Sequence, residues 1–327
     1  MTLAAPITVA IHELGRGMRD SLRDDVRSGL ARPPRTLSPK WFYDERGCEL
    51  FDDITRLPEY YQTRTEASIL REHAAPLMRE LRPRRIVEIG SGTCDKTRIL
   101  LDAAWRQGTL ETFVPFDVSH SVVHASAVDL VETYPGLRVE AVVGDFALHL
   151  GAIAPAESQL VVFLGSTIGN LDDAQRTTFL RQVREILEPD GRFLLGVDVV
   201  KDSAALIAAY DDSQGVTADF NRNVLRVINR ELDGDFDENG FDHVALWNDD
   251  DHRIEMHLRS RADQRVTISR AGMTIDLLAG ETIRTEISVK FTRAIVEAEL
   301  NASGMRLDRW LTDAGGNFAL ALVRPVG

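Results

Sequence analysis

Residues 63–200 alternate between amphipathic segments of helical period and short apolar runs rich in β-branched side chains, which are typical of buried strands. Strands separated by helix-length connections pair in parallel, and a parallel sheet needs helices on both faces. The pattern predicts an α/β fold with a mostly parallel sheet whose ligands bind beyond the carboxyl ends of its strands. The expected strands are 85–89, 113–118, 137–143, 160–164 and 192–200, and the expected helices are 63–81, 96–105, 121–133 and 172–187.

The alternation stops between residues 201 and 290, where two expected helices, 204–212 and 217–231, precede a run of strand-like segments. A helix and two strands then return the chain to the sheet after residue 291. Residues 16–62 are aromatic and punctuated by proline, and they have no place in the alternating series. We therefore expect two domains: a sheet domain formed by 63–200 and 291–327, and a smaller α+β domain formed by 16–62 and 201–290 that binds the substrate.

The charge of the chain limits its partners. It has 38 Lys and Arg against 51 Asp and Glu, a net charge of −13 over 327 residues. A negative surface repels nucleic-acid phosphates and anionic membranes, so neither is expected as a partner. Cys48 and Cys94 lie far apart and indicate neither a disulfide framework nor a zinc site. With no secretory signal and no apolar run long enough to span a bilayer, the expected location is the cytoplasm.

The segment Val87–Thr97 (VEIGSGTCDKT) ends an expected strand in a glycine turn and then begins a helix. A dinucleotide-binding fingerprint requires a third glycine at position 95, and a phosphate-binding Walker A loop requires a glycine at the same place. Position 95 is Asp95, whose side chain would crowd the loop and set a negative charge against phosphate. The two phosphate-binding interpretations are therefore disfavoured.

S-adenosylmethionine is a third ligand of such turns, and it carries a cationic sulfonium in place of phosphate. Glu88 and Asp95 would tolerate or attract this cation, while Gly90 and Gly92 let the backbone approach the ligand. The same segment also fits a purely structural turn. The acidic turn alone favours neither interpretation over the other.

Acidic side chains also end the next two expected strands. Asp117 could accept from both ribose hydroxyls, although a helix N-cap is the simpler interpretation of that residue. Asp145 could accept from an adenine amine, and Phe146 could cover the ring. The carboxyl ends of parallel strands meet at one edge of the sheet. The three positions together therefore favour S-adenosylmethionine.

Several motifs resemble those of the bacterial L-histidine Nα-methyltransferases of ergothioneine biosynthesis. The resemblance covers nearly the whole chain after about residue 20, and FLGSTIGN and FNRN are its most specific parts. The motifs are Leu57–Tyr61 (LPEYY), Glu88–Gly92, Lys96–Arg98, Val162–Leu171 (VFLGSTIGNL), Tyr210–Asp212, Phe220–Asn223 (FNRN) and Trp247–Asn248.

The resemblance implies a class I methyltransferase (Rossmann-like) domain with a substrate-binding domain, and three methyl transfers from S-adenosylmethionine to the α-amino group of L-histidine, giving hercynine. It implies no metal, and we expect a monomer. The cofactor contacts that it implies are Gly90, Lys96, Asp117, Asp145 and Phe146. The implied histidine contacts are Tyr60, Asn170, Tyr210, Met256, Glu286 and Ser288, with Tyr43 nearby.

Methyl transfer from a sulfonium is an in-line displacement, so the enzyme mainly positions a neutral amine behind the methyl group. Asn170 and Tyr43 are the expected catalytic residues, because they could accept N–H bonds from the amine without adding positive charge. Glu286 and Ser288 would then bind the imidazole. The alternative for the segment 285–289 is an alternating strand whose polar face meets water.

Three other functions stay open at this point. An ATP-dependent enzyme could use the near-Walker turn, although Gly165 stands where an Asp would be needed at the end of the strand 160–164. A methyltransferase of the same fold could act on tryptophan or another amino acid. A noncatalytic protein could bind the ligands without turnover.

Overall fold

The computed structural model describes residues 7–11 and 17–326, which form two compact units. The core unit consists of residues 7–11, 64–199 and 291–326, and the insert unit consists of residues 17–63 and 200–290. Each unit has a sheet and an apolar core of its own. No helix among the described residues has both the length and the apolar character needed to cross a bilayer.

The core unit is built on an eight-stranded sheet in the order β1-β5-β4-β3-β6-β7-β14-β13. The strands from β1 to β7 in this order pair in parallel, and β14 and β13 add an antiparallel edge. The chain runs outward from β3 in one direction and restarts at β6 in the other, so the sheet has a switch point between β3 and β6. The strands are β1 (Ile7–Ile11), β3 (Arg85–Ile89), β4 (Thr112–Asp117), β5 (Arg138–Val143), β6 (Gln159–Phe163), β7 (Arg192–Asp198), β13 (Met305–Thr312) and β14 (Phe318–Pro325).

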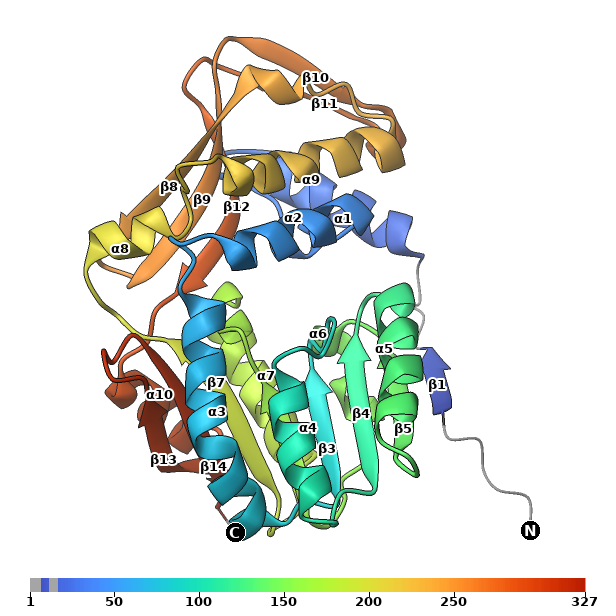
Figure 1. Ribbon diagram of the computed structural model, residues 1–327. Helices are drawn as coiled ribbons and strands as arrows, with labels where there is room; N and C mark the ends of the chain where they lie inside the picture. Colours follow the sequence, from blue (N-terminus) through green and yellow to red (C-terminus); the bar gives the residue numbers. More distant parts are fainter. Residues whose placement is uncertain (1–6, 12–16, 327) are drawn as a thin grey trace. The chain divides into compact units, whose positions relative to one another are not determined.

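Helices cover both faces of this sheet, as expected for parallel strands buried on both sides. Apolar residues of α3, α4 and α5 pack with Ile86, Phe113 and Leu160 on one face (Figure 1). On the other face, the rings of Phe179 in α7 and Phe163 in β6 lie 4.6 Å apart. The helical elements are α3 (Gln62–Leu81), α4 (Thr97–Arg106), α5 (His120–Thr133), α6 (Phe146–His149), η2 (Leu150–Ala152), η3 (Thr167–Asn170), α7 (Asp173–Glu185) and α10 (Arg293–Ala302).

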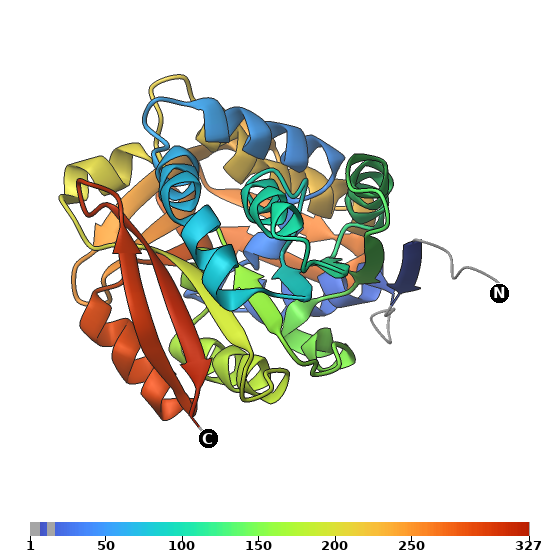
Figure 2. The ribbon, with the colours of Figure 1, turned by 60° about the horizontal axis from the view of Figure 1, so that its bottom comes forward.

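The C-terminal hairpin returns the chain to the core sheet, which confirms the expectation from residues 305–323. β14 pairs with β7, and β13 pairs with β14 (Figure 2). Asp313 shapes the connecting turn, because its carboxylate accepts the backbone N–H groups of Gly315, Asn317 and Phe318 at 2.7–3.0 Å. The predicted α/β class with a mostly parallel sheet is therefore correct.

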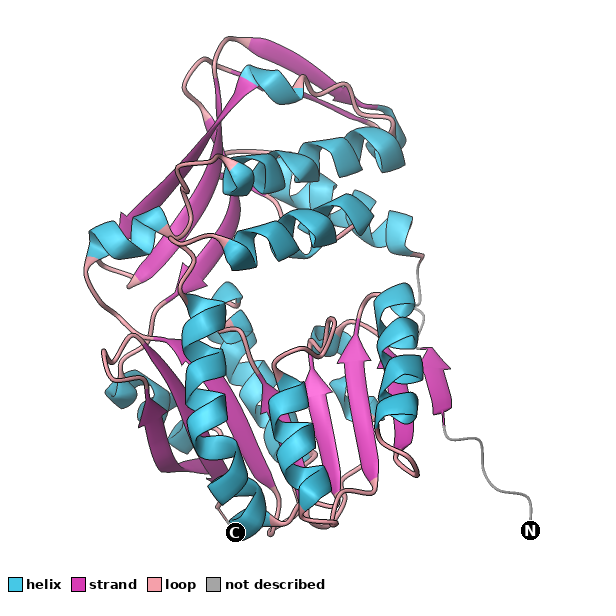
Figure 3. Ribbon diagram, viewed as in Figure 1, coloured by secondary structure: helices cyan, strands magenta, loops and turns pink. Residues whose placement is uncertain are grey.

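The insert unit contains a four-stranded sheet in the order β2-β12-β9-β8 and a separate hairpin of β10 and β11. Helix α9 packs against β8 and β9, and α1 and α2 join the same apolar core (Figure 3). Its strands are β2 (Arg35–Thr36), β8 (Phe241–Asn248), β9 (Arg253–Ser260), β10 (Gln264–Ile268), β11 (Met273–Leu277) and β12 (Thr282–Val289). Its helical elements are α1 (Met18–Leu30), η1 (Pro39–Phe42), α2 (Glu45–Arg56), α8 (Ser203–Ala208), α9 (Val216–Leu232), η4 (Glu238–Gly240) and η5 (Ser269–Ala271).

Several elements carry too weak a pattern to be expected from sequence. The residues of β8 do not alternate between apolar and polar, because most positions along the strand are half-buried and neither face is fully buried or fully exposed. β1 is an edge strand whose side chains are mostly exposed. The predicted helix 204–212 is too long, because α8 ends at Ala208 and Asp212 instead accepts the backbone N–H groups of Gln214, Val216 and Thr217.

Candidate active site

The glycine turn follows β3, at the switch point of the core sheet. Gly90 and Gly92 have φ angles of 66° and 47°, which glycine adopts without the steric cost that a side chain would bring. The N–H groups of Gly90 and Ser91 donate to Phe116 O at 2.8 and 3.1 Å, so the turn is tied to the end of β4. A Cβ on Gly92 would meet no atom within 4 Å, so the space beside it is open to a ligand.

The third left-handed residue of the turn is Cys94, with φ of 60°, and not the residue at position 95. Asp95 is exposed and accepts from the Thr93 hydroxyl at 2.7 Å. The expectation that the Asp95 side chain crowds the loop is therefore wrong, because this side chain is exposed and the left-handed position is that of Cys94. The thiol of Cys94 is buried, and burial raises its pKa well above the ordinary value.

Glu88 lies inside the core unit and is only 3% exposed. Burial raises its pKa to about 8, although the Thr97 hydroxyl donates to Glu88 Oε1 and the charge of Lys96 opposes the shift. Without a ligand, Glu88 is therefore mainly protonated at neutral pH. The buried Cys94 thiol, a weak donor, interacts with Glu88 and Ser91. Glu88 Oε2 and the Ser91 hydroxyl have no stronger hydrogen-bond partner in the described part of the chain.

Asp117 ends β4, and Asp145 lies two residues beyond the end of β5. Asp117 accepts from the Gly92 N–H at 2.9 Å and from the Ser119 N–H at 3.0 Å, while burial raises its pKa. Asp145 caps α6 and accepts from the Ala147 N–H at 2.9 Å. Asp145 thus has the role of a helix N-cap, whereas the N-cap of α5 is Ser119 and not Asp117. The roles of the two acids toward a ribose and an adenine stay predictions.

Phe146 and Lys96 complete the predicted cofactor contacts. The Phe146 ring packs edge-on to Phe163 and Phe179, with centroids 5.5 and 5.7 Å away. Lys96 forms an ion pair with Glu66, whose side chain is 0% exposed. The same carboxylate accepts from the Gly165 N–H at 2.9 Å, at the end of β6. Glu66 therefore connects α3, the glycine turn and the β6 end, a role that its local sequence does not reveal.

Asn170 also lies beyond β6, in the short helix η3. The preceding Ser166 has φ of 56°, and its hydroxyl accepts from the Asp198 N–H at 2.9 Å. The predicted motif 162–171 thus forms a tight loop at the carboxyl end of the core sheet. Asn170 belongs to the core unit, whereas the other predicted histidine contacts belong to the insert unit.

Three tyrosines lie in the aromatic core of the insert unit. The ring centroids of Tyr60 and Tyr210 are 6.4 Å apart, and those of Tyr43 and Phe51 are 5.6 Å apart. Burial, followed by the nearby Glu286, raises the pKa of Tyr43 well above its ordinary value. Tyr43 is therefore a neutral hydroxyl at physiological pH, which can donate or accept a hydrogen bond but does not act as a phenolate base.

Glu286 and Ser288 lie on β12, next to β9, which carries Met256. The pairing of β12 with β9 shifts register between Arg284 and Glu286, and such a bulge redirects the following side chains. Glu286 is 8% exposed, Ser288 2% and Met256 1%. The alternative of a polar strand face in water is therefore wrong. Burial raises the pKa of Glu286 to about 7, against the effect of Lys290.

The Phe220–Asn223 motif supports these side chains from α9. Asn221 donates to His243 Nδ1 at 2.8 Å, so the other ring nitrogen, His243 Nε2, donates to the Tyr210 carbonyl at 2.8 Å. Asn223 donates to the Phe42 carbonyl at 3.1 Å, one residue before Tyr43. The two asparagines thus fix the backbone beside two of the tyrosines.

Lys290 is the residue of this cluster that sequence reasoning missed. Its ammonium donates to Tyr210 Oη and to Ser288 Oγ, both at 2.8 Å. Its position could have been found from the spacing, because residues 286, 288 and 290 follow the strand period of two and share one side of β12.

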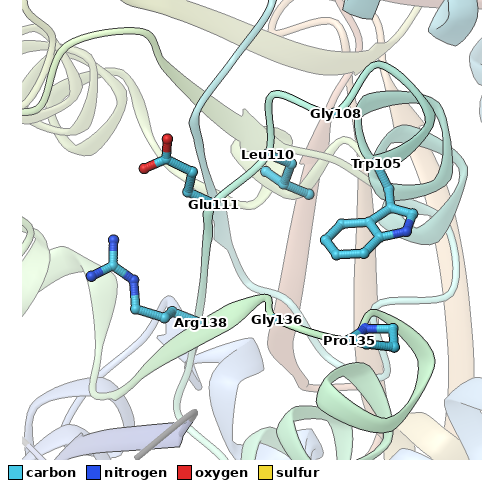
Figure 4. A pocket seen from close by; sticks show the side chains of 7 residues that line it. All are labelled: Trp105, Gly108, Leu110, Glu111, Pro135, Gly136 and Arg138. Carbon is cyan, nitrogen blue, oxygen red and sulfur yellow. The ribbon is translucent and has the colours of Figure 1, made fainter. Parts of the chain in front are cut away.

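A surface pocket of about 420 Å³ lies away from these residues (Figure 4). It adjoins the amino ends of β4 and β5, whereas ligands of such sheets bind at the carboxyl ends. Its Glu111 is engaged by Arg84 at 2.9 and 3.0 Å. The pocket is lined by Trp105, Gly108, Leu110, Glu111, Pro135, Gly136 and Arg138.

Within residues 7–11 and 17–326, no group of three His, Cys, Asp or Glu side chains suits a metal ion.

Comparisons with known proteins show what the chain is similar to. A family model described as "Histidine-specific methyltransferase, SAM-dependent" matches residues 22–325. The histidine N-alpha-methyltransferase of Mycolicibacterium smegmatis is 51% identical over 93% of this chain and 94% of its own length. That of Mycobacterium tuberculosis is 52% identical over 92% of this chain and 94% of its own length. Ergothioneine biosynthesis protein 1 of Neurospora crassa is 29% identical over 77% of this chain, which matches 31% of that longer protein.

Proposed function

Because this chain belongs to the family of histidine-specific, S-adenosylmethionine-dependent methyltransferases, we propose that it methylates the α-amino group of L-histidine three times to give hercynine in ergothioneine biosynthesis. The observation that carries this proposal is the 51% identity to a histidine N-alpha-methyltransferase over 93% of the chain, a match that extends through both units. The aromatic and acidic cluster of the insert unit supports an amino acid with a polar ring as the substrate.

The core unit fits S-adenosylmethionine by its chemistry. Two buried polar atoms at the glycine turn, Glu88 Oε2 and Ser91 Oγ, have no partner stronger than the Cys94 thiol among the described residues, and the space beside Gly92 is open. Burial also raises the pKa of Asp117, and a cationic ligand would favour its ionised form. When bound, the cosubstrate supplies an electrophilic methyl group on a sulfonium. The proposed contacts are Gly90, Lys96, Asp117, Asp145 and Phe146.

The other residues bind and orient histidine. Tyr60, Asn170 and Tyr210 would fix its carboxylate and amine. Glu286 and Ser288 would bind the imidazole, and Met256 would pack on the ring. Asn170 and Tyr43 would accept the N–H bonds of the α-amino group, which aligns the nitrogen lone pair for transfer. Burial holds the Tyr43 hydroxyl neutral, so it adds no charge next to the amine. The amine must lose one proton before each of the three transfers.

The division of labour follows from this assignment. Residues 63–200 and 291–327 would form the methyltransferase domain, and residues 16–62 and 201–290 would form the substrate-binding domain. We also propose that the enzyme is a cytoplasmic monomer that needs no metal ion and binds neither nucleic acid nor membrane. Its net charge of −13 supports the last two points.

Mass spectrometry of a reaction with purified protein, S-adenosylmethionine and histidine tests the proposal. We expect the mono-, di- and trimethyl products in succession, and no product when tryptophan replaces histidine. Methylation of tryptophan but not histidine would assign the chain to the alternative substrate. Ligand binding without product would contradict an enzymatic function.

Glu286→Ala tests the assignment of the imidazole contact. We expect weaker histidine binding and slower turnover, with binding of S-adenosylhomocysteine unchanged. Unchanged histidine affinity and turnover would mean that Glu286 does not bind the ring.

A further inference from the structure

Lys290 is a buried lysine that directly follows β12. Its side chain is 0% exposed, and its backbone N–H donates to the His252 carbonyl at 2.7 Å. An ammonium group loses its hydration on burial, and this cost is offset only when hydrogen bonds replace the water. Lys290 is therefore held at a defined place in the polar cluster of the insert unit.

The ammonium group and two hydroxyl groups form a triangle. Lys290 Nζ lies 2.8 Å from Tyr210 Oη and 2.8 Å from Ser288 Oγ, and these two oxygens are 2.8 Å from each other. The Lys290 ammonium also lies 4.6 Å from the centroid of the Tyr210 ring, in cation–π geometry. All three sides of the triangle have hydrogen-bond length.

The protons of this triangle are constrained by the ammonium. Lys290 can only donate, so both hydroxyl oxygens accept from it. The distance between Tyr210 Oη and Ser288 Oγ allows either oxygen to donate. We assign Tyr210 as the donor, because its phenol is more acidic than an aliphatic hydroxyl. Ser288 Oγ then uses both lone pairs, one for Lys290 and one for Tyr210. With this assignment its own proton points out of the triangle, so toward any further partner Ser288 can only donate.

We propose that Lys290 is a positioning residue that locks Ser288 as a hydrogen-bond donor to an acceptor atom on the substrate's ring. This inference rests on the proposed function, because it takes Ser288 to face the imidazole of histidine. Without Lys290, one lone pair of Ser288 is released and the hydroxyl can turn, so the site loses its directional donor.

Glu286 supplies the complementary group on the same side of β12. The charge of Lys290 lowers the pKa of Glu286 against the effect of burial, which favours the ionised, accepting form of the carboxylate. The two residues then offer one acceptor and one donor. A neutral imidazole has one N–H donor and one bare nitrogen acceptor, so it matches this pair. Lys290 thus sets the polarity of the site without touching the substrate.

A double-mutant cycle on the full chain tests the role of Lys290. The variants are Lys290→Met, Ser288→Ala and their combination, and calorimetry measures histidine affinity with S-adenosylhomocysteine present. We expect Lys290→Met to weaken histidine binding by about tenfold in the wild-type background and by less than about threefold in the Ser288→Ala background. The affinity for S-adenosylhomocysteine alone should change by less than about twofold, since that site is proposed in the core unit.

Other results of the cycle would overturn either the role of Lys290 or the proposed function. Histidine affinity that is unchanged in Lys290→Met, or an equal loss in both backgrounds, would overturn the proposal, because Lys290 would then not act through Ser288. If Lys290→Met does not fold, Lys290→Gln replaces it in the cycle; its amide keeps one donor, so the loss should be smaller but should still depend on Ser288. A wild-type protein that does not bind histidine would instead refute the proposed function itself.

Discussion

The stability of Glu88→Gln relative to the wild type should rise with pH. The Glu88 side chain is 3% exposed, and burial raises its pKa from 4.5 to about 8. Between these two values the unfolded chain releases the proton and the folded chain keeps it. The free energy of unfolding therefore falls as pH rises, by about 1.4 kcal/mol per pH unit, and the loss is complete only above the folded pKa.

The size of the effect follows from the same two values. At pH 7 the loss has accumulated over about 2.5 pH units, which corresponds to about 3 kcal/mol. Gln cannot ionise, so the variant escapes this loss. The amide N–H groups of the new Gln side chain would meet no acceptor stronger than the Cys94 sulfur among the described residues. This adds a cost of about 1–3 kcal/mol that does not depend on pH. The test therefore depends on how the difference in unfolding free energy between the two proteins changes with pH, and not on its value at one pH.

Urea unfolding of both proteins at several pH values measures this slope. Between about pH 5.5 and about pH 7.5, the difference in unfolding free energy should rise by about 2.5 kcal/mol in favour of Glu88→Gln. Glu132→Gln, at an exposed position of α5, is the matched control and should follow the wild type at each pH. A constant difference between Glu88→Gln and the wild type would refute the claim that Glu88 is protonated in the folded state.

Three further changes test other parts of the site. Gly92→Ala should lower the unfolding free energy, measured by thermal unfolding, by about 1–2 kcal/mol, because φ at Gly92 is 47°. Gly151→Ala is the control: φ is not positive there and the space for a Cβ is open, so the unfolding free energy should change by less than about 0.5 kcal/mol. Glu66→Gln should cost about 2 kcal/mol in urea unfolding, since Lys96 loses its buried partner while Gln still accepts from the neighbouring backbone. Glu286→Gln should weaken histidine binding about tenfold at about pH 8 but less at about pH 6. The pKa of Glu286 is raised to about 7, so the substitution removes a mainly ionised acceptor only at the higher pH. Calorimetry at both pH values measures the difference in affinity.

The alternating part of the chain could be predicted almost residue by residue. The expected strand 85–89 has the same bounds as β3, and the expected helix 121–133 differs from α5 by one residue. These elements are buried on both faces or along one helical stripe, so the periodicity of the sequence alone defines them. The glycine turn was predicted for the same reason, because the strand before it and the helix after it leave only a few residues for the connection.

Contacts between distant residues could not be predicted in this way. The pattern Thr63–Glu66 predicts a capping box, but α3 begins at Gln62, and Glu66 binds the Gly165 N–H and Lys96 instead. A carboxylate four residues into a helix looks the same in the sequence whether it caps its own helix or reaches across the fold. Only the packing of α3 on the sheet distinguishes the two.

Glu88 and Glu286 show how the fold shifts the same residue type at two separate sites. Both are buried glutamates at or near the end of a strand, and burial raises the pKa of each, to about 8 and about 7. The Thr97 hydroxyl and the charge of Lys96 oppose the effect of burial on Glu88, and the charge of Lys290 opposes it on Glu286. Both carboxyl groups therefore titrate near neutral pH, where either can change between a donating and an accepting form. Neither shift can be predicted from the sequence, because burial and the neighbouring lysine act on each glutamate only in the folded chain.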